Sequence, residues 1–269
     1  MLGELHAFRY CSKTPNHALV ISLGFGAHGG IYDSFCTYYA ETKGADIWSY
    51  DAPGHGRSTR STRPRGQFEF AEWAQAGVDF ATYVKQETGL PVFLLGSSFG
   101  AAAAYSGAYA EAVTGSIIMG SAFVPGGPFT AKIRAPLKSE ATQTVIKVLG
   151  HGARIDVDLT FDLDEDYGIE GASEMKHADP WNTWSYDLSS RASVVTYAQL
   201  DPIEKNEKTI MLDGGEKDTS FQPEVIKATA AAIAGPVECI IMPNATHQMM
   251  IYHTEDFSEV LEAFVKQHI

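Results

Sequence analysis

The sequence predicts an α/β domain with a mostly parallel central sheet and helices on both of its faces. Short apolar runs, rich in β-branched and aromatic residues, alternate with segments whose apolar residues recur at helical spacing. Strands that alternate with helices in this way form parallel sheets, because each connecting helix crosses one face. The chain has 269 residues, 45% hydrophobic and 20% charged, which suits one large domain with a modest insertion.

The elements can be assigned in order along the chain. Buried strands are predicted at residues 18–23, 46–50, 91–95 and 116–119, then at 209–212 and 237–242. Helices are predicted around 33–41, 70–84, 99–110 and 223–234, and from 254 to the end. Gly89 lies just past the second helix and is a typical C-terminal stop.

This alternation breaks between about 125 and 200, where prolines, glycines and an acidic run gather. We therefore predict a core made of residues 1–124 and 201–269, with a lid inserted at 125–200. Within the lid, residues 155–164 alternate strictly between apolar and polar, which predicts an amphipathic strand. The acidic run at 162–166 lacks the glycine and closing glutamate of a calcium loop, so we expect a solvated acidic face.

Charge and cysteine usage limit the partners. The formal net charge is -13, from 33 acidic and 20 basic residues, which disfavours nucleic acid and anionic membranes. The three cysteines form no CxxC pair, and the N-terminus has no signal-peptide pattern. No run approaches the ~20 apolar residues needed to span a bilayer. We expect a cytoplasmic protein without stable membrane insertion, and an apolar lid face would also support a homodimer.

The strongest chemical signal is the pentapeptide G-x-S-x-G, which places Ser98 at its centre. An apolar strand ends just before it and a small-residue helix begins just after it. A serine on such a strained strand-to-helix turn projects its hydroxyl out of the sheet, and the glycines allow the two elements to approach closely. The pattern predicts that Ser98 is a nucleophile.

A serine hydroxyl needs a base and an orienting acid. Among the nine histidines, His247 follows the predicted strand at 237–242, at the same carboxyl edge of the sheet as Ser98. Asp218 lies several residues beyond the strand at 209–212, far enough to reach the histidine. Asp213, at the end of that strand, is the alternative acid. The order Ser, Asp, His along the chain fits this assignment.

The loop after the first predicted strand, Gly24 to Gly30, is rich in glycine. Such a loop lets backbone N–H groups approach a bound acyl group, and the N–H groups of Phe25 and Phe99 are the candidate oxyanion donors. The spacing of Gly24, Gly26 and Gly29 also fits a dinucleotide motif, with Asp51 where a ribose-binding acid would stand. Dinucleotide binding would leave Ser98 and His247 unexplained.

Four motifs, in order, resemble the α/β-hydrolase superfamily, in particular its monoacylglycerol lipase, lysophospholipase and carboxylesterase branch. They are LGFGAHG, YDAPGHGRS, GSSFG, and GGEKD followed by NATH. The resemblance implies an α/β-hydrolase fold with a mostly parallel sheet of about eight strands and a lid after the sixth. It also implies a serine esterase that needs no cofactor or metal and acts on a small-molecule ester. Candidate substrate-binding residues are Gly24, His28, Trp181 and Trp184.

Other activities use the same fold and residues, so they stay open at this point. They are a thioesterase, a lactonase, a carbon–carbon bond hydrolase and a cofactor-independent oxygenase. From a different class, a non-catalytic small-molecule receptor would keep the fold without turnover.

Overall fold

The computed structural model describes residues 5–59, 63–150, 152–197 and 205–269. Its central element is a seven-stranded sheet in the order β1-β3-β2-β4-β5-β8-β9. β1 pairs antiparallel with β3 and all other pairs in this sheet are parallel. The strands are β1 (Ala7–Cys11), β2 (His17–Ser22), β3 (Ala45–Tyr50), β4 (Val92–Ser97), β5 (Gly115–Met119), β8 (Ile210–Gly215) and β9 (Val237–Met242).

The sequence patterns account for the position of each strand in the sheet. β2, β4, β5 and β8 are buried along their whole length, as expected for parallel strands covered on both faces. β1 alternates between exposed and half-buried residues, which fits an edge strand. The sequence did not predict β1, because its run AFRYC has little apolar continuity.

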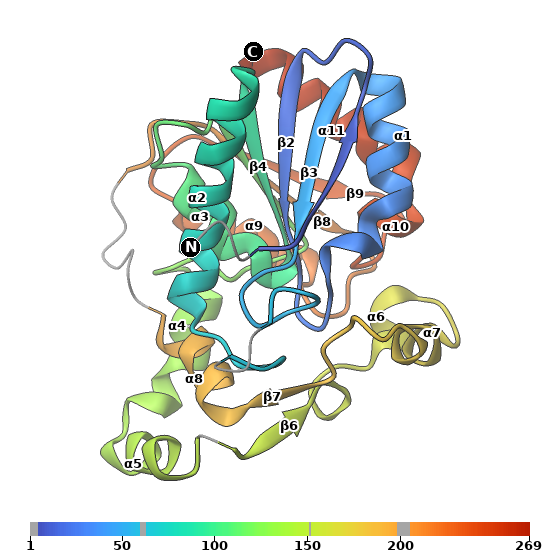
Figure 1. The fold of residues 1–269 in the computed structure, drawn as a ribbon. Helices are drawn as coiled ribbons and strands as arrows, with labels where there is room; N and C mark the ends of the chain where they lie inside the picture. Colours follow the sequence, from blue (N-terminus) through green and yellow to red (C-terminus); the bar gives the residue numbers. More distant parts are fainter. Residues whose placement is uncertain (1–4, 60–62, 151, 198–204) are drawn as a thin grey trace.

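Helices cover both faces of the sheet (Figure 1). α1 (Asp33–Lys43), α10 (Met249–Tyr252) and α11 (Thr254–His268) lie on one face, and α2 (Phe70–Thr88), α3 (Ala101–Gly107) and α9 (Pro223–Ala232) lie on the other. The predicted stop at Gly89 is confirmed. It caps α2 with a φ of 70°, a left-handed conformation that glycine adopts without strain.

The segment between β5 and β8 forms a separate layer beyond the carboxyl ends of the strands (Figure 1). We call its described residues, 125–150 and 152–197, the insert. It contains an antiparallel pair of short strands, β6 (Arg154–Asp156) and β7 (Ser185–Asp187). Its helices are α4 (Pro128–Arg134), α5 (Glu140–Leu149), α6 (Leu163–Tyr167), α7 (Ala172–Ala178) and α8 (Leu188–Thr196).

The insert is tied to the core next to the glycine-rich loop. The Gly26 N–H donates to the Tyr186 hydroxyl at 2.8 Å, and the Thr183 N–H donates to the Gly26 carbonyl at 3.0 Å. Phe68, which precedes α2, donates its N–H to the Ser190 hydroxyl at 2.9 Å. These bonds fix the insert over the edge of the sheet where the catalytic side chains were predicted.

The prediction of one strand over 155–164 is wrong in extent. Only residues 154–156 are extended, a 3-10 turn (Val157–Leu159) follows, and α6 begins at Leu163. Asp162 caps α6, since its carboxylate accepts the Glu165 N–H at 3.1 Å. A local side-chain cap has therefore overridden the period-two pattern.

The prediction that the acidic run is a solvated face is also wrong in part. Asp164 accepts the N–H groups of Gly171 and Ser173 at 2.9 and 2.8 Å. Asp166 is buried, with 5% of its surface exposed. The run thus supplies two helix caps and one buried carboxylate, while Asp162 and Glu165 remain exposed.

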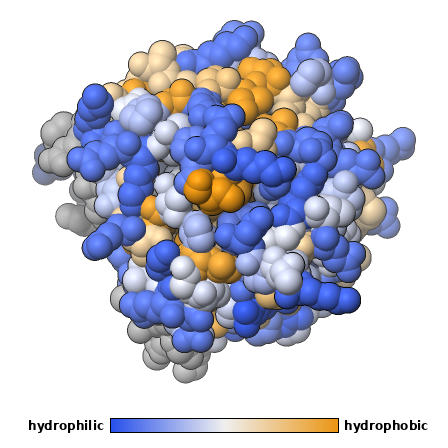
Figure 2. All heavy atoms as spheres, turned by 90° about the horizontal axis from the view of Figure 1, so that it is seen from above, coloured by the Kyte–Doolittle hydropathy of each residue, from blue (hydrophilic) through white to orange (hydrophobic). Residues whose placement is uncertain are grey.

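On the face opposite the insert, hydrophobic side chains form separate patches between hydrophilic ones (Figure 2). Within the described ranges, none of the helices is both long and apolar enough to cross a membrane.

Candidate active site

Ser98 stands at a strained turn between β4 and α3. Its φ is +51°, in the left-handed region that costs a non-glycine residue about 1–3 kcal/mol. A Cβ at Gly96 would lie 2.1 Å from the Gly100 carbonyl oxygen, and a Cβ at Gly100 would lie 2.3 Å from the Ser22 carbonyl oxygen. Both glycines of the pentapeptide are therefore required by close backbone contacts, as the sequence predicted.

The structure brings His247 and Asp218 together. The His247 Nδ1 lies 2.8 Å from Asp218 Oδ2, and both side chains are buried. The other carboxylate oxygen of Asp218 accepts the Phe221 N–H at 2.8 Å. With both oxygens bonded, Asp218 is held in place and fixes the orientation of the imidazole.

Asp213, the alternative acid, lies elsewhere. It is part of β8, it is fully buried, and neither carboxylate oxygen has a hydrogen-bond partner among the described residues. Burial raises the pKa of Asp213 well above its ordinary value. Asp213 therefore makes no hydrogen bond to His247, and its burial disfavours the charged form that an orienting acid needs.

The surroundings of His247 act on its pKa in both directions. Burial lowers the pKa, whereas the hydrogen bond and charge of Asp218 raise it and the charge of Asp166 adds to the rise. Lys176 opposes these carboxylates, yet the net effect is a pKa above the ordinary value of 6.5. The imidazolium form is thus stabilised in a buried site, which suits a base that must accept a proton during reaction.

Ser98 and His247 line the same pocket, which we call the catalytic pocket. The N–H of Phe25, also in its wall, has no acceptor among the described residues. By contrast, the N–H of Gly24 donates to the Tyr32 hydroxyl at 3.3 Å and that of Gly26 donates to Tyr186. Phe99, the first residue after Ser98, belongs to the same wall. The two residues predicted to supply the oxyanion donors thus line the same pocket as Ser98.

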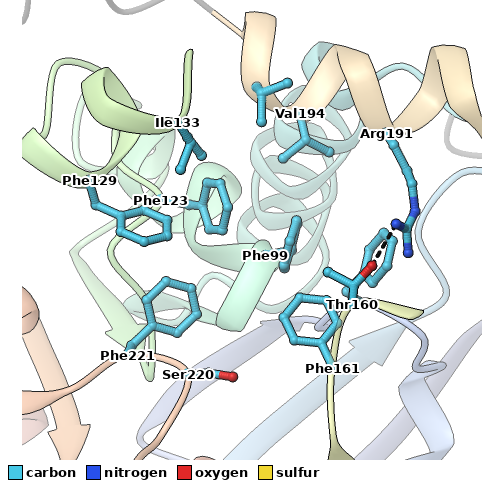
Figure 3. Close-up of a pocket in the computed structure, with 12 residues that line it drawn as sticks. Phe99, Phe123, Phe129, Ile133, Thr160, Phe161, Arg191, Val194, Ser220 and Phe221 are labelled. Atoms are coloured by element: carbon cyan, nitrogen blue, oxygen red, sulfur yellow. Dashed lines mark hydrogen bonds between the residues drawn. The ribbon is translucent and has the colours of Figure 1, made fainter. Parts of the chain in front are cut away.

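The catalytic pocket adjoins an apolar cavity of about 310 Å³ (Figure 3). Phe25, Phe99 and Phe161 line both spaces. The other residues around the apolar cavity come from the insert, from the segment after β5 and from the loop after β8: Phe123, Phe129, Ile133, Thr160, Arg191, Val194, Val195, Ser220 and Phe221. An apolar group attached to a carbonyl at Ser98 would therefore find a phenylalanine-rich space next to it.

Three predicted substrate-binding residues lie outside both spaces. The His28 Nε2 lies 2.8 Å from Asp179 Oδ2, Trp181 packs under the Arg57 guanidinium at 4.1 Å, and Trp184 stacks on His177 with ring centroids 3.5 Å apart. These side chains hold the insert together and against the core, and none of the three lines either of the two spaces described above. Gly24 does line the catalytic pocket.

The carboxylate of Asp51 is held by two backbone N–H groups. Its two carboxylate oxygens accept the N–H groups of Gly29 and Arg57, each at 2.7 Å, and the side chain is fully buried. It therefore ties the glycine-rich loop to the turn after β3. These bonds explain the carboxylate without a bound ribose.

The sequence patterns did not indicate a site role for Asp166 or for most of the phenylalanines of the apolar cavity. Asp166 stands in an acidic run, but it is the fourth residue of α6 and shares the buried face of that helix with Leu163 and Tyr167. Its spacing of three residues from Leu163 is the signal that could have indicated its burial. Oxygen and nitrogen atoms of Asp166, Asp218 and His247 lie within 4.8 Å of one another, and within the part of the chain described this is the one group spaced to hold a metal ion. The direct Asp218–His247 hydrogen bond already uses the facing atoms of two of them.

Comparison with known proteins gives the family. The model of the Alpha/beta hydrolase family matches residues 19–262. No curated protein sequence matches the chain. Similar solved structures include a thermostable carboxyl esterase from Bacillus coagulans, with 16% identity, a TM-score of 0.75, and coverage of 98% of this chain and 94% of that chain.

Two lipases have the same fold. A monoacylglycerol lipase from Paleococcus ferrophilus has 18% identity and a TM-score of 0.69, covering 98% of this chain and 99% of that chain. A soluble variant of monoglyceride lipase from Saccharomyces cerevisiae has 14% identity and a TM-score of 0.74, covering 98% and 92%. At this identity the structures show a shared fold. Together with the family match over most of the sequence, they establish that the chain belongs to the alpha/beta hydrolase family.

Proposed function

We propose that this protein is a serine hydrolase of carboxylic esters, with Ser98 as nucleophile, His247 as base and Asp218 as orienting acid. The observation that carries the proposal is the buried His247–Asp218 hydrogen bond, 2.8 Å long, in the wall of the pocket that also holds the strained Ser98. Nucleophile, base and acid in this order on this fold perform acyl transfer.

The proposed reaction has two halves. The Ser98 Oγ attacks the ester carbonyl while His247 takes the hydroxyl proton, and the N–H groups of Phe25 and Phe99 stabilise the oxyanion. The bond from carbonyl carbon to leaving alcohol then breaks, and His247 gives its proton to that alcohol. Water repeats the sequence on the acyl-enzyme, which releases the acid and restores Ser98.

The apolar cavity supports an apolar acyl group as the part of the substrate that is recognised. Its volume of about 310 Å³ lies at the low end of the ~300–1,000 Å³ typical of ligand pockets. We therefore propose short to medium aliphatic or aromatic acyl groups. The insert, which supplies part of the wall, acts as the lid of this site in the proposal.

The test is hydrolysis of p-nitrophenyl esters from acetate to palmitate by the wild type and by Ser98→Ala. We expect a rate maximum at short to medium chains and a loss of several orders of magnitude in Ser98→Ala. A fluorophosphonate probe should label Ser98 in the wild type. An inert wild type whose Ser98 stays unlabelled would contradict the proposal.

A further inference from the structure

Asp166 is a buried carboxylate of the insert that reaches the catalytic histidine. It lies in α6 and lines the catalytic pocket together with Ser98. Its backbone carbonyl accepts the His247 N–H at 3.3 Å, and its side chain accepts the Thr219 hydroxyl proton at 3.2 Å. It therefore contacts both loops that carry the histidine and the acid.

The side chain is close enough to act on the imidazole through its charge. One oxygen of Asp166, one of Asp218 and a ring nitrogen of His247 all lie within 4.8 Å of one another. All three residues are buried, so solvent screens their charges weakly. A second carboxylate at this range favours the protonated form of the ring.

We propose that Asp166 is a positioning residue through which the insert tunes His247: seated on the catalytic loop, its carboxylate adds to that of Asp218 in stabilising the imidazolium. This inference rests on the function proposed above for the triad. If the insert moves away from the His247 loop, the Asp166 carboxylate leaves with it. Full activity therefore depends on contact between the insert and that loop.

Among the described residues, the charges that act on His247 come from three elements. Asp218 belongs to the loop after β8, Asp166 to α6, and Lys176 to α7, where the Lys176 ammonium also contacts the Tyr167 hydroxyl. Burial lowers the pKa of Lys176 to about 8, although the nearby Asp166 and Asp179 favour its charged form. Asp166 and Lys176 therefore act on the imidazole with opposite sign, which provides an internal control.

The experiment compares pH profiles of kcat/KM on p-nitrophenyl butyrate for the wild type, Asp166→Asn, Lys176→Met and Glu165→Gln. In Asp166→Asn we expect the acidic limb to move to lower pH by about half a unit to one unit. The kcat should fall by about 3- to 30-fold with KM little changed, because the lost interaction is strongest in the transition state. Lys176→Met should move the limb the opposite way, and the exposed Glu165 of the same helix should have no effect.

A purely structural role for Asp166 would lower the melting temperature and the rates without moving the limb, and this result would overturn the inference. The same titration is followed by proton NMR of the His247 ring, which needs no substrate. If the wild type hydrolyses no ester, the proposed function fails, while the NMR shift in Asp166→Asn still decides whether the carboxylate acts on the ring. If Asp166→Asn does not fold, an unmoved His247 titration in Lys176→Met counts against the inference.

Discussion

The ring of Phe25 stacks on that of Phe99 with centroids 4.8 Å apart. These are the residues whose N–H groups we propose as oxyanion donors, and both residues line the catalytic pocket as well as the apolar cavity. Tyr186 of the insert stacks on the other side of Phe25 at 4.1 Å. One aromatic stack therefore joins the insert to both residues that we propose as backbone donors.

Substitution deeper in the cavity should change chain-length preference without harming catalysis. Phe129 lines the apolar cavity but not the catalytic pocket. We expect Phe129→Ala to move the optimum of the p-nitrophenyl ester series toward longer acyl chains. The substitution removes a phenyl ring and so enlarges the cavity on the side away from Thr160 (Figure 3). Hydrolysis of the acetate should stay within about threefold of wild type, since a missing contact in a pocket is worth ~1–3 kcal/mol only to the group that fills it.

Val145→Ala is the matched control, since Val145 belongs to the insert but is 50% exposed. Its chain-length profile should equal that of the wild type. An unchanged optimum in Phe129→Ala would show that the acyl group binds elsewhere.

Because the backbone at Ser98 is strained, a glycine at this position should stabilise the fold although it abolishes activity. Glycine adopts a φ of +51° freely, whereas alanine keeps the strain of serine. Ser98→Gly should therefore be more stable than Ser98→Ala by about 1 kcal/mol, while both are inactive. Urea unfolding monitored by circular dichroism measures the difference.

Ser97 provides the control for this comparison. Its φ is -84°, an ordinary conformation, so Ser97→Gly should gain nothing over Ser97→Ala and lose some stability through backbone entropy. Equal stabilities of Ser98→Gly and Ser98→Ala would contradict the strain.

Substitution of the two candidate acids, Asp218 and Asp213, should have different effects on kcat. Asp218→Asn keeps the shape of the hydrogen-bond partner but favours the wrong imidazole tautomer, and we expect kcat to fall by about 10⁴-fold. Asp213→Asn should keep kcat within a few fold, because Asp213 has no hydrogen bond to His247.

For the wild type, kcat/KM should be lost as pH falls through a value above 6.5, since the pKa of His247 is raised.

The sequence was sufficient where one local pattern decides the structure. Ser98 was predictable because a strand, two glycines and a helix meet there, and His247 because it follows a strand at the carboxyl edge. The insert was not predictable in detail. The Asp162 cap ends the alternation of residues 155–164, and Asp166 differs from the exposed Asp162 and Glu165 through its contacts with the loops that carry His247 and Asp218. Asp166 does share a helical face with Leu163 and Tyr167, but five residues are too short a helix for that period to stand out from the alternation of residues 155–164.

Asp213 predicts an unusual dependence of stability on pH. Its carboxyl is fully buried without a hydrogen-bond partner among the residues described, and burial raises its pKa well above 3.8. Above pH 3.8 the unfolded chain has released this proton, whereas the folded protein keeps it up to the raised pKa. In that window the folded state binds more protons, so this group lowers the free energy of unfolding by about 1.4 kcal/mol for each unit of rising pH.

Asp213→Asn cannot titrate and removes this slope. The variant should gain stability relative to wild type as pH rises above 3.8 toward the raised pKa of Asp213, as measured by urea unfolding at several pH values. Asp256→Asn, at an exposed site in α11, gives the background for loss of one surface carboxylate. A difference between wild type and Asp213→Asn that stays constant with pH would mean that this carboxyl is ionised in the folded protein, with a partner that compensates its charge.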